Sequence, residues 1–130
     1  MRADFIDASF YIALIDDKDQ WHRRALALKT DLSSSPVTTN LVAAEVLASI
    51  GSRKGGKKAL TVWHALEDSG EVVFVTRDQW KPALDLVLVR DGRLSIADAC
   101  SVVVMLERHL KRIVSFDEGF DSIAGVERLH

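Results

Sequence analysis

The chain has 130 residues, of which 48% are hydrophobic and 28% charged, and its formal net charge is −2. This length fits one domain over residues 1–130 with a continuous hydrophobic core. No apolar run is long enough to span a bilayer, and the first residues lack the apolar region of a secretory signal, so we expect neither membrane insertion nor export. The single cysteine, Cys100, cannot form an internal disulfide and is compatible with the cytoplasm, where we expect the protein to be.

The charge balance of 17 Lys and Arg against 19 Asp and Glu argues against simple binding to a phosphate backbone. It does not exclude an enzyme that acts on nucleic acid. Acids gathered around a metal would leave the remaining surface more basic than the net charge of −2 indicates. A lone cysteine without a cluster of His and Cys argues against zinc.

The first part of the chain predicts a strand and two helices. Residues 2–6 predict a short strand that leads directly to Asp7. The apolar block 10–15 predicts a helix capped near Asp7 or Ser9. Apolar residues then recur at helical spacing from 21 to 32, which predicts a second helix.

A second strand and a helical region follow. The β-branched residues 37–39 predict a strand, and Asn40 is placed to cap a helix over 41–50 that ends at Gly51. Residues 52–58 combine adjacent glycines with basic side chains, and predict a mobile basic loop or the start of a helix.

The next unit is a helix over 60–66 closed by Gly70, and then a strand over 71–75. Residues 77–89 predict a further helix, with Pro82 in or near its first turn, where proline is tolerated. The second half of this helix is apolar nearly all round. We therefore expect it to be buried or shared across an interface.

The last part of the chain begins with a turn at 91–92. Ser95 is placed to cap a helix from 96 to about 110, and residues 112–115 and 126–129 predict the final strands. Strands therefore alternate with helices along the chain. This order predicts an α/β fold in which a mainly parallel sheet is covered on both faces.

Four acids fall at the ends of predicted strands or on the helices that follow them. Asp7 and Asp117 follow strands directly, Glu45 lies on the helix after the second strand, and Asp98 lies in the first turn of the helix after Ser95. In an open α/β sheet these places meet at the carboxyl edge, where ligands bind. Acids that are distant in sequence are therefore expected to converge there.

Clustered carboxylates repel one another, and protons or divalent cations relieve the repulsion. Oxygen ligands suit Mg²⁺ or Mn²⁺, which polarise a phosphate and lower the pKa of bound water. The pattern thus predicts phosphodiester hydrolysis without a protein nucleophile. Taken singly, such acids most often have structural explanations: Asp7 and Asp98 as helix-capping acids, Glu45 as a solvated helix residue, and Asp117 as a turn residue.

Four segments, in order along the chain, resemble the motifs of PIN domains, and most closely those of VapC-type ribonuclease toxins: 5–9, 40–46, 94–99 and 114–120. The resemblance implies a three-layer α/β/α sandwich with a central parallel sheet. It also implies an endoribonuclease that depends on Mg²⁺ or Mn²⁺ and acts as the toxin of a type II toxin–antitoxin pair. The implied partners are RNA, a cognate antitoxin and a second copy of the chain.

By this resemblance the family's four acids fall on Asp7, Glu45, Asp98 and Asp117, which are the expected metal-binding and catalytic residues. Glu45 is expected either to bind metal or to orient the attacking water as a base. Supporting roles are expected for Ser9 and Ser115, which match small polar positions beside the site. Apart from the resemblance, Asp121 lies close to Asp117 and is either a turn or rim residue or a supporting residue in the outer shell. Ala8 stands where the family often has Thr, which removes a hydroxyl but no ligand.

Basic side chains after the Glu45 helix either grip RNA phosphates or are solvated at a helix junction: Arg53, Lys54, Lys57 and Lys58. Three tryptophans have apolar helical neighbours and are expected to be core or interface anchors rather than base-stacking platforms: Trp21, Trp63 and Trp80.

Two other functions stay open for the same fold: a housekeeping nuclease of RNA processing and a non-catalytic binding module. A phosphoacceptor receiver domain also clusters acids at a sheet edge. It requires an acidic pair at the end of the first strand, whereas Asp7 is followed by Ala8.

Overall fold

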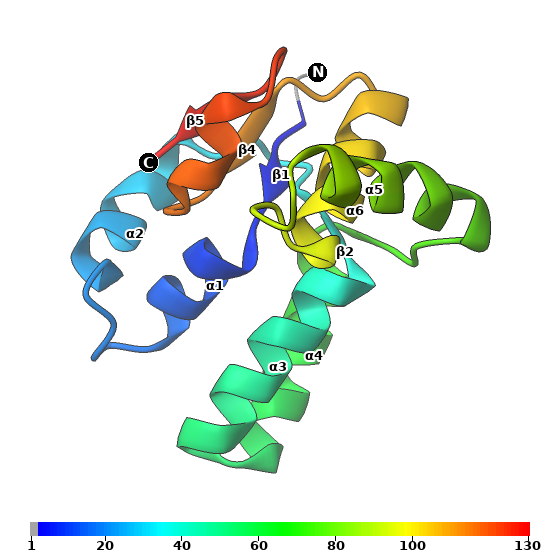
Figure 1. The fold of residues 1–130 in the computed structure, drawn as a ribbon. Helices are drawn as coiled ribbons and strands as arrows, with labels where there is room; N and C mark the ends of the chain where they lie inside the picture. Colours follow the sequence, from blue (N-terminus) through cyan, green and yellow to red (C-terminus); the bar gives the residue numbers. More distant parts are fainter. Residues whose placement is uncertain (1–2) are drawn as a thin grey trace.

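The computed structural model describes residues 3–130. Within this range one parallel sheet has the strand order β3-β2-β1-β4-β5 (Figure 1). Its strands are β1 (Phe5–Ile6), β2 (Val37–Thr39), β3 (Glu71–Val73), β4 (Arg112–Val114) and β5 (Glu127–Leu129). The first strand thus lies at the centre of the sheet, between β2 and β4. The predicted start of this strand at Arg2 lies outside the described residues.

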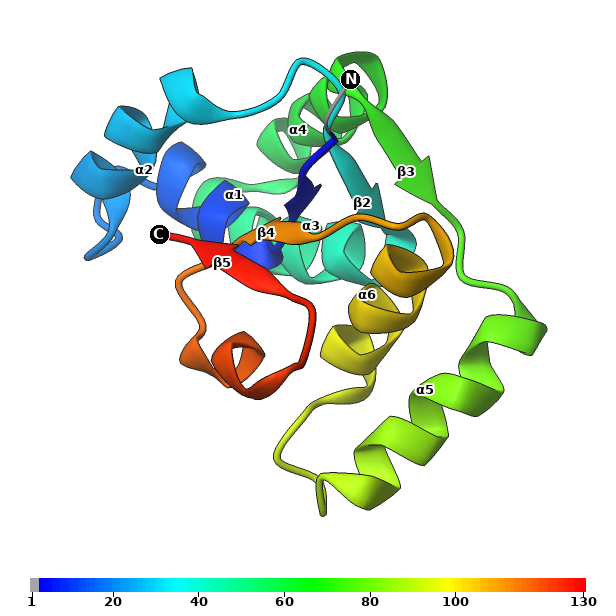
Figure 2. The ribbon, with the colours of Figure 1, turned by 90° about the horizontal axis from the view of Figure 1, so that it is seen from above.

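Helices connect the strands and cover both faces of the sheet. They are α1 (Ala8–Ile15), α2 (His22–Leu28), α3 (Asn40–Lys54), α4 (Gly56–Ser69), α5 (Arg77–Val89) and α6 (Ile96–Glu107), with short 3-10 helices η1 (Lys29–Asp31) and η2 (Glu118–Ser122). Helices α5 and α6 lie together on one side of the sheet, and α1 and α2 on the other (Figure 2). Helices α3 and α4 form a hairpin that extends beyond the sheet (Figure 1).

Alternation along the central strands separates the core into two layers. Phe5 and Ile113 belong to the larger hydrophobic cluster, which includes the buried side of α6, whereas Ile6 and Val114 belong to a second cluster with α1 and α2. All four side chains are at most 1% exposed. Such burial on both faces is what a parallel sheet between helical layers requires. The predicted α/β/α sandwich is therefore confirmed.

The limits of α3 differ from the prediction at both ends. The hydroxyl of Thr39, not the side chain of Asn40, caps the helix by accepting a hydrogen bond from the Val42 N–H at 3.1 Å. Helix α3 also continues through Gly51 to Lys54, because α4 packs beside it there. It ends at Gly55, where φ is +90°, a conformation that favours glycine.

Helix α5 has its predicted start, fixed by a capping box of Thr76 and Gln79, and Pro82 lies in the second turn, near the first as expected. Of the two alternatives for its apolar end, burial within the chain is excluded, since Leu88 and Val89 are 79% and 75% exposed. A shared interface stays a prediction. Among residues 3–130, no helix combines the length and apolar character needed to cross a membrane.

Candidate active site at the carboxyl edge of the sheet

Asp7 lies where the central strand β1 ends and α1 begins. It occupies the cap position of α1, but its side chain makes no capping hydrogen bond. Instead, the hydroxyls of Ser9 and Ser115 donate to its Oδ2 at 2.9 and 2.7 Å. The residue is only 5% exposed. Burial raises the pKa of Asp7, and the two serine hydrogen bonds oppose that rise.

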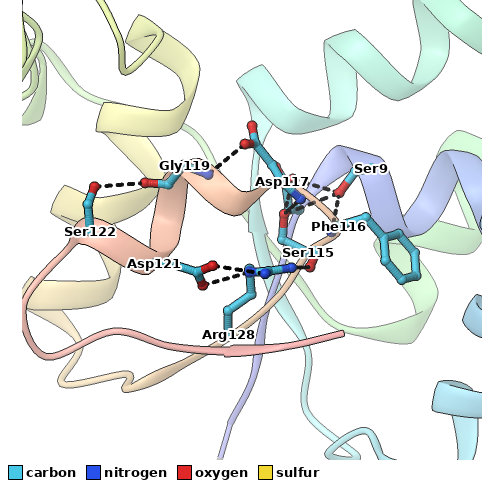
Figure 3. Close-up of polar contacts among 9 residues, drawn as sticks. Ser9, Ser115, Phe116, Asp117, Gly119, Asp121, Ser122 and Arg128 are labelled. Atoms are coloured by element: carbon cyan, nitrogen blue, oxygen red, sulfur yellow. Dashed lines mark hydrogen bonds and ion pairs between the residues drawn. The ribbon is translucent and has the colours of Figure 1, made fainter.

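The two serines link β1, α1 and the end of β4. Their hydroxyls are 3.2 Å apart, and the Phe116 N–H donates to Ser9 Oγ at 2.9 Å. The Asp117 N–H donates to Ser115 Oγ at 3.0 Å (Figure 3). One pair of hydroxyls therefore holds both the Asp7 carboxylate and the backbone that carries Asp117.

Asp117 and Asp121 lie on the same short segment but have different surroundings. Asp117 is exposed, and its Oδ1 accepts a hydrogen bond from the Gly119 N–H at 2.8 Å. Asp121 pairs with Arg128 through two hydrogen bonds of 2.7 and 2.9 Å, and Arg128 also donates to the Ser115 carbonyl at 3.2 Å (Figure 3). The structure thus connects Asp121 to the site through Arg128 rather than placing its carboxylate among the other acids.

Glu45 and Asp98 approach the same edge from α3 and α6. Ser95 caps α6, as predicted, by accepting from the Asp98 N–H at 3.1 Å, so Asp98 stands in the first turn. Burial, and then the negative charge of Asp7, raise the pKa of Asp98 to about 7; Asp117 and Glu45 add to this effect and Ser95 opposes it. Burial raises the pKa of Glu45 too, with Asp7 and Asp117 contributing.

These mutual effects mean that the four acids share one electrostatic neighbourhood, although they come from four separate elements. They are not drawn into a closed cage. Across residues 3–130, no three acidic, histidine or cysteine side chains are close enough to form a ready-made metal-binding group. An open set of carboxylate oxygens nevertheless fits Mg²⁺ or Mn²⁺, because such hard cations keep several water ligands and take only part of their shell from the protein.

A groove of about 450 Å³ adjoins the acids, and its lining includes Ser9, Glu45, Asp117, Arg53, Trp21 and Phe116. A larger hollow of about 850 Å³ lies where β2 and β3 begin, beside Pro36 and Gly70. It is at the opposite edge of the sheet from the acids. The smaller groove is therefore the candidate for the functional site.

The basic residues after Glu45 form no loop. Arg53 and Lys54 end α3, a single residue, Gly55, makes the turn, and Lys57 and Lys58 lie on α4. Arg53 contacts Asp16 at 2.5 Å and lines the groove, and Lys54 is 3.8 Å from Asp17. Lys57 and Lys58 are exposed and do not line the groove. The structure therefore brings only Arg53 of the four next to the acids.

Two tryptophans are not in the core, which leaves only the interface alternative of the expectation for them. Trp21 is 44% and Trp80 39% exposed, whereas Trp63 packs against the core. Trp21 lines the groove beside the acids and stacks on Phe116. Sequence reasoning missed this residue because it lies just before α2, where helical spacing does not determine which face a side chain covers. The one signal in the sequence for an aromatic surface at the site was a second aromatic residue, Phe116, directly before Asp117.

A parallel α/β domain with acids at the carboxyl edge of its sheet has the architecture of a class of metal-dependent nucleases, though not of that class alone, and comparison with known proteins identifies the family. The model of the PIN domain matches residues 5–126. The chain belongs to the PIN-domain family, which confirms the resemblance seen in its motifs.

Relatives and solved structures agree with this assignment. Ribonuclease VapC13 of Mycobacterium tuberculosis is 41% identical over 59 residues, which are 45% of this chain and 44% of the relative; the matched part is thus less than half of either protein. The structure of M. tuberculosis VapC20, described as a toxin that cleaves the sarcin–ricin loop, has a TM-score of 0.84 and 27% identity over 92% of this chain and 93% of that one. A toxin–antitoxin complex from Klebsiella pneumoniae has a TM-score of 0.72 and 14% identity over 95% of both chains, and supports the fold.

Proposed function

We propose that this chain is a metal-dependent endoribonuclease and the toxin of a type II toxin–antitoxin pair. The observation that carries the proposal is the meeting of Asp7, Glu45, Asp98 and Asp117 beside a groove at the carboxyl edge of the sheet. The choice of RNA as substrate is supported by the ribonuclease names of the relatives. The acids themselves support only hydrolysis of a phosphodiester.

In the proposed mechanism Asp7, Asp98 and Asp117 hold the metal, and Glu45 stands beside them. Bound Mg²⁺ or Mn²⁺ would neutralise charge on the phosphate and stabilise the leaving oxygen. Glu45 is the most suitable base, because its side chain lines the groove and can accept a proton from the attacking water. Ser9 and Ser115 keep the Asp7 carboxylate in place throughout.

Partners are proposed from exposed apolar surface. The side chains of Leu84, Leu88 and Val89 on α5 are 47%, 79% and 75% exposed, which suits a homodimer contact. A separate apolar hollow between α3, α4 and the end of β3, which includes Leu60 and Phe74, suits an antitoxin segment. A cytoplasmic location is supported by the buried, unpaired Cys100.

The test compares cleavage of a structured RNA by the purified protein in Mg²⁺, in Mn²⁺ and in chelator. Asp7→Asn, Asp98→Asn and Asp117→Asn should each reduce cleavage at least about 100-fold without loss of helical signal. Asp85→Asn, which changes an exposed acid on α5, is the matched control and should retain full activity. Full cleavage by all three site variants, or equal cleavage of DNA of the same sequence, would contradict the proposal.

A toxic effect on growth, relieved when a neighbouring small gene is expressed, would distinguish a toxin from a housekeeping nuclease. Growth arrest should disappear with Asp98→Asn. If expression is harmless while the purified protein still cuts RNA, the toxin role is wrong and the nuclease activity stands.

A further inference from the structure

Trp21 and Phe116 form a stacked aromatic pair at the edge of the acidic groove. Their ring centroids are 5.2 Å apart and their planes differ by 9°. We propose that Trp21, supported from behind by Phe116, is a stacking platform for a nucleobase of the RNA next to the phosphate that is cut. This inference rests on the proposed ribonuclease function, and gives that function a binding subsite.

A row of stacked aromatic rings connects the platform to the hydrophobic core. Phe10, which is 1% exposed, stacks on Phe116 with centroids 6.4 Å apart, and Phe116 stacks on Trp21. The backbone of Phe116 is fixed because its N–H donates to Ser9 Oγ at 2.9 Å. In Figure 3 the Phe116 ring points away from the Asp117 carboxylate, so it leaves that acid accessible.

Trp21 is also fixed by its own backbone. Its N–H donates to Asp19 Oδ1 at 2.8 Å, and its carbonyl accepts from the Ala25 N–H at 2.8 Å. One face of the indole rests on Phe116, yet 44% of the residue remains exposed. A large, rigid and exposed ring loses little conformational freedom when it binds, which suits it to stacking.

The pair also separates two hollows. Trp21 and Phe116 line the groove that contains Glu45 and Asp117, and they line a second hollow of about 180 Å³ that includes Arg24 and Arg128. A strand of RNA that leaves the acids in this direction must cross the aromatic pair. Arg24 then stands beyond it as an exposed cation for the next phosphate, with its Nη2 donating only to the His130 carbonyl at 2.8 Å among the described residues.

Across the surface, the acids, the aromatic pair and the cation follow one another in the same order as phosphate, base and phosphate along a single strand. Aromatic platforms beside cationic grooves bind single-stranded nucleic acid without reading its sequence. We therefore expect Trp21 to contribute to RNA binding generally and not to the choice of cleavage site.

The test is steady-state cleavage by wild type, Trp21→Ala, Trp21→Phe and the control Trp80→Ala, which alters a similarly exposed tryptophan on α5. Trp21→Ala should raise KM about 5- to 150-fold, the range for one stacked base, and change kcat less than about threefold. Trp21→Phe should recover most of the loss, and Trp80→Ala should match wild type. An RNA with one abasic nucleotide next to the cut should bind to wild type more weakly than the intact RNA does. Trp21→Ala should bind the two RNAs equally.

An unchanged KM for Trp21→Ala, while wild type cuts RNA, overturns the platform and leaves the proposed function intact. Loss of antitoxin binding with an unchanged KM also overturns it, because Trp21 would then contact a protein partner. If wild type cuts no RNA with either metal, the ribonuclease proposal fails instead. RNA binding measured in chelator still tests the platform in that case, and equal affinity of wild type and Trp21→Ala would contradict it.

Discussion

The hydroxyl of Ser115 donates to the Asp7 carboxylate at 2.7 Å, although the two residues are 108 positions apart in the chain. The contact joins the ends of β1 and β4, which are neighbouring strands in the centre of the sheet. Ser115 Oγ also accepts the Asp117 N–H, so one hydroxyl orients two of the four acids. A group in this place affects the reaction without touching the substrate.

Ser115→Ala is expected to lower kcat/KM about 10- to 100-fold, the usual effect of removing a partner that orients a metal ligand. More metal should be needed for half-maximal activity, which a Mg²⁺ titration of cleavage measures. Ser115→Thr keeps the hydroxyl and should retain most activity. Ser69→Ala, at the far end of α4, is the control for loss of a serine hydroxyl, and an equal loss there would contradict a specific role for Ser115.

The stability of the metal-free protein is expected to fall as pH rises. Because the pKa of Asp98 is raised to about 7, its carboxyl keeps a proton in the folded state after the unfolded chain has lost it. The free energy of unfolding therefore decreases between about pH 4 and pH 7 and is level above. Denaturant unfolding in chelator at pH 5 and pH 8 measures this difference.

Asp98→Asn should reduce that difference by on the order of 1 to 2 kcal/mol, a value that allows for solvent screening. Added Mg²⁺ should stabilise wild type more at pH 8 than at pH 5, since it replaces the proton. An identical pH dependence in wild type and Asp98→Asn would show that another group is responsible.

Arg112 is expected to be essential for stability through Asp4. The Asp4 carboxylate is fully buried and receives hydrogen bonds of 2.7 and 2.8 Å from the Arg112 guanidinium. Arg112→Ala removes this guanidinium from a buried carboxylate and should lower the free energy of unfolding by about 3 to 5 kcal/mol. The double variant Asp4→Leu with Arg112→Met should recover much of the loss in urea unfolding. If it does not, packing rather than charge explains the effect.

Lys57 and Lys58 are expected to bind RNA phosphates outside the groove. Neither side chain has an ion-pair partner among residues 3–130, in contrast to Arg53 and Lys54. Replacing both lysines with Ala should weaken RNA binding and reduce its salt dependence by about 0.7 in the log–log slope for each lost contact. Filter binding over a range of salt measures this slope. The double variant Lys81→Ala with Lys111→Ala is the control, because it removes the same positive charge elsewhere. An unchanged slope for Lys57→Ala with Lys58→Ala would show that those lysines do not contact RNA phosphates.

Much of the fold followed from local pattern. Helix α5 has the predicted bounds, Ser95 caps α6, and the strands that precede Asp7 and Asp117 occur where β-branched and aromatic residues gather. These features depend on neighbours in sequence, so a single chain reveals them. The predicted end of α3 at Gly51 is wrong, because the glycine is only a local signal and the packing of α4 beside α3 lets the helix continue to Lys54.

The contacts that build the site could not be predicted in the same way. The hydrogen bond from Ser115 to Asp7, the contact between the Ser9 and Ser115 hydroxyls, and the stacking of Trp21 on Phe116 join segments that lie far apart in the sequence. The pair of Asp4 and Arg112 becomes evident only once the sheet order is known, because the pairing of Phe5 with Ile113 places the preceding residues side by side. Tertiary register, not local propensity, determines all of these contacts.

The central position of β1 has a consequence for the timing of activity. Its neighbour β4 and the acid Asp117 are made only after β1, β2, β3 and the helices between them. Strand pairs so distant in sequence form late in folding, after the local helices. A growing chain therefore carries no assembled site until β4 and Asp117 have been made. The topology itself delays the proposed activity until these last elements of the sheet and site have joined β1.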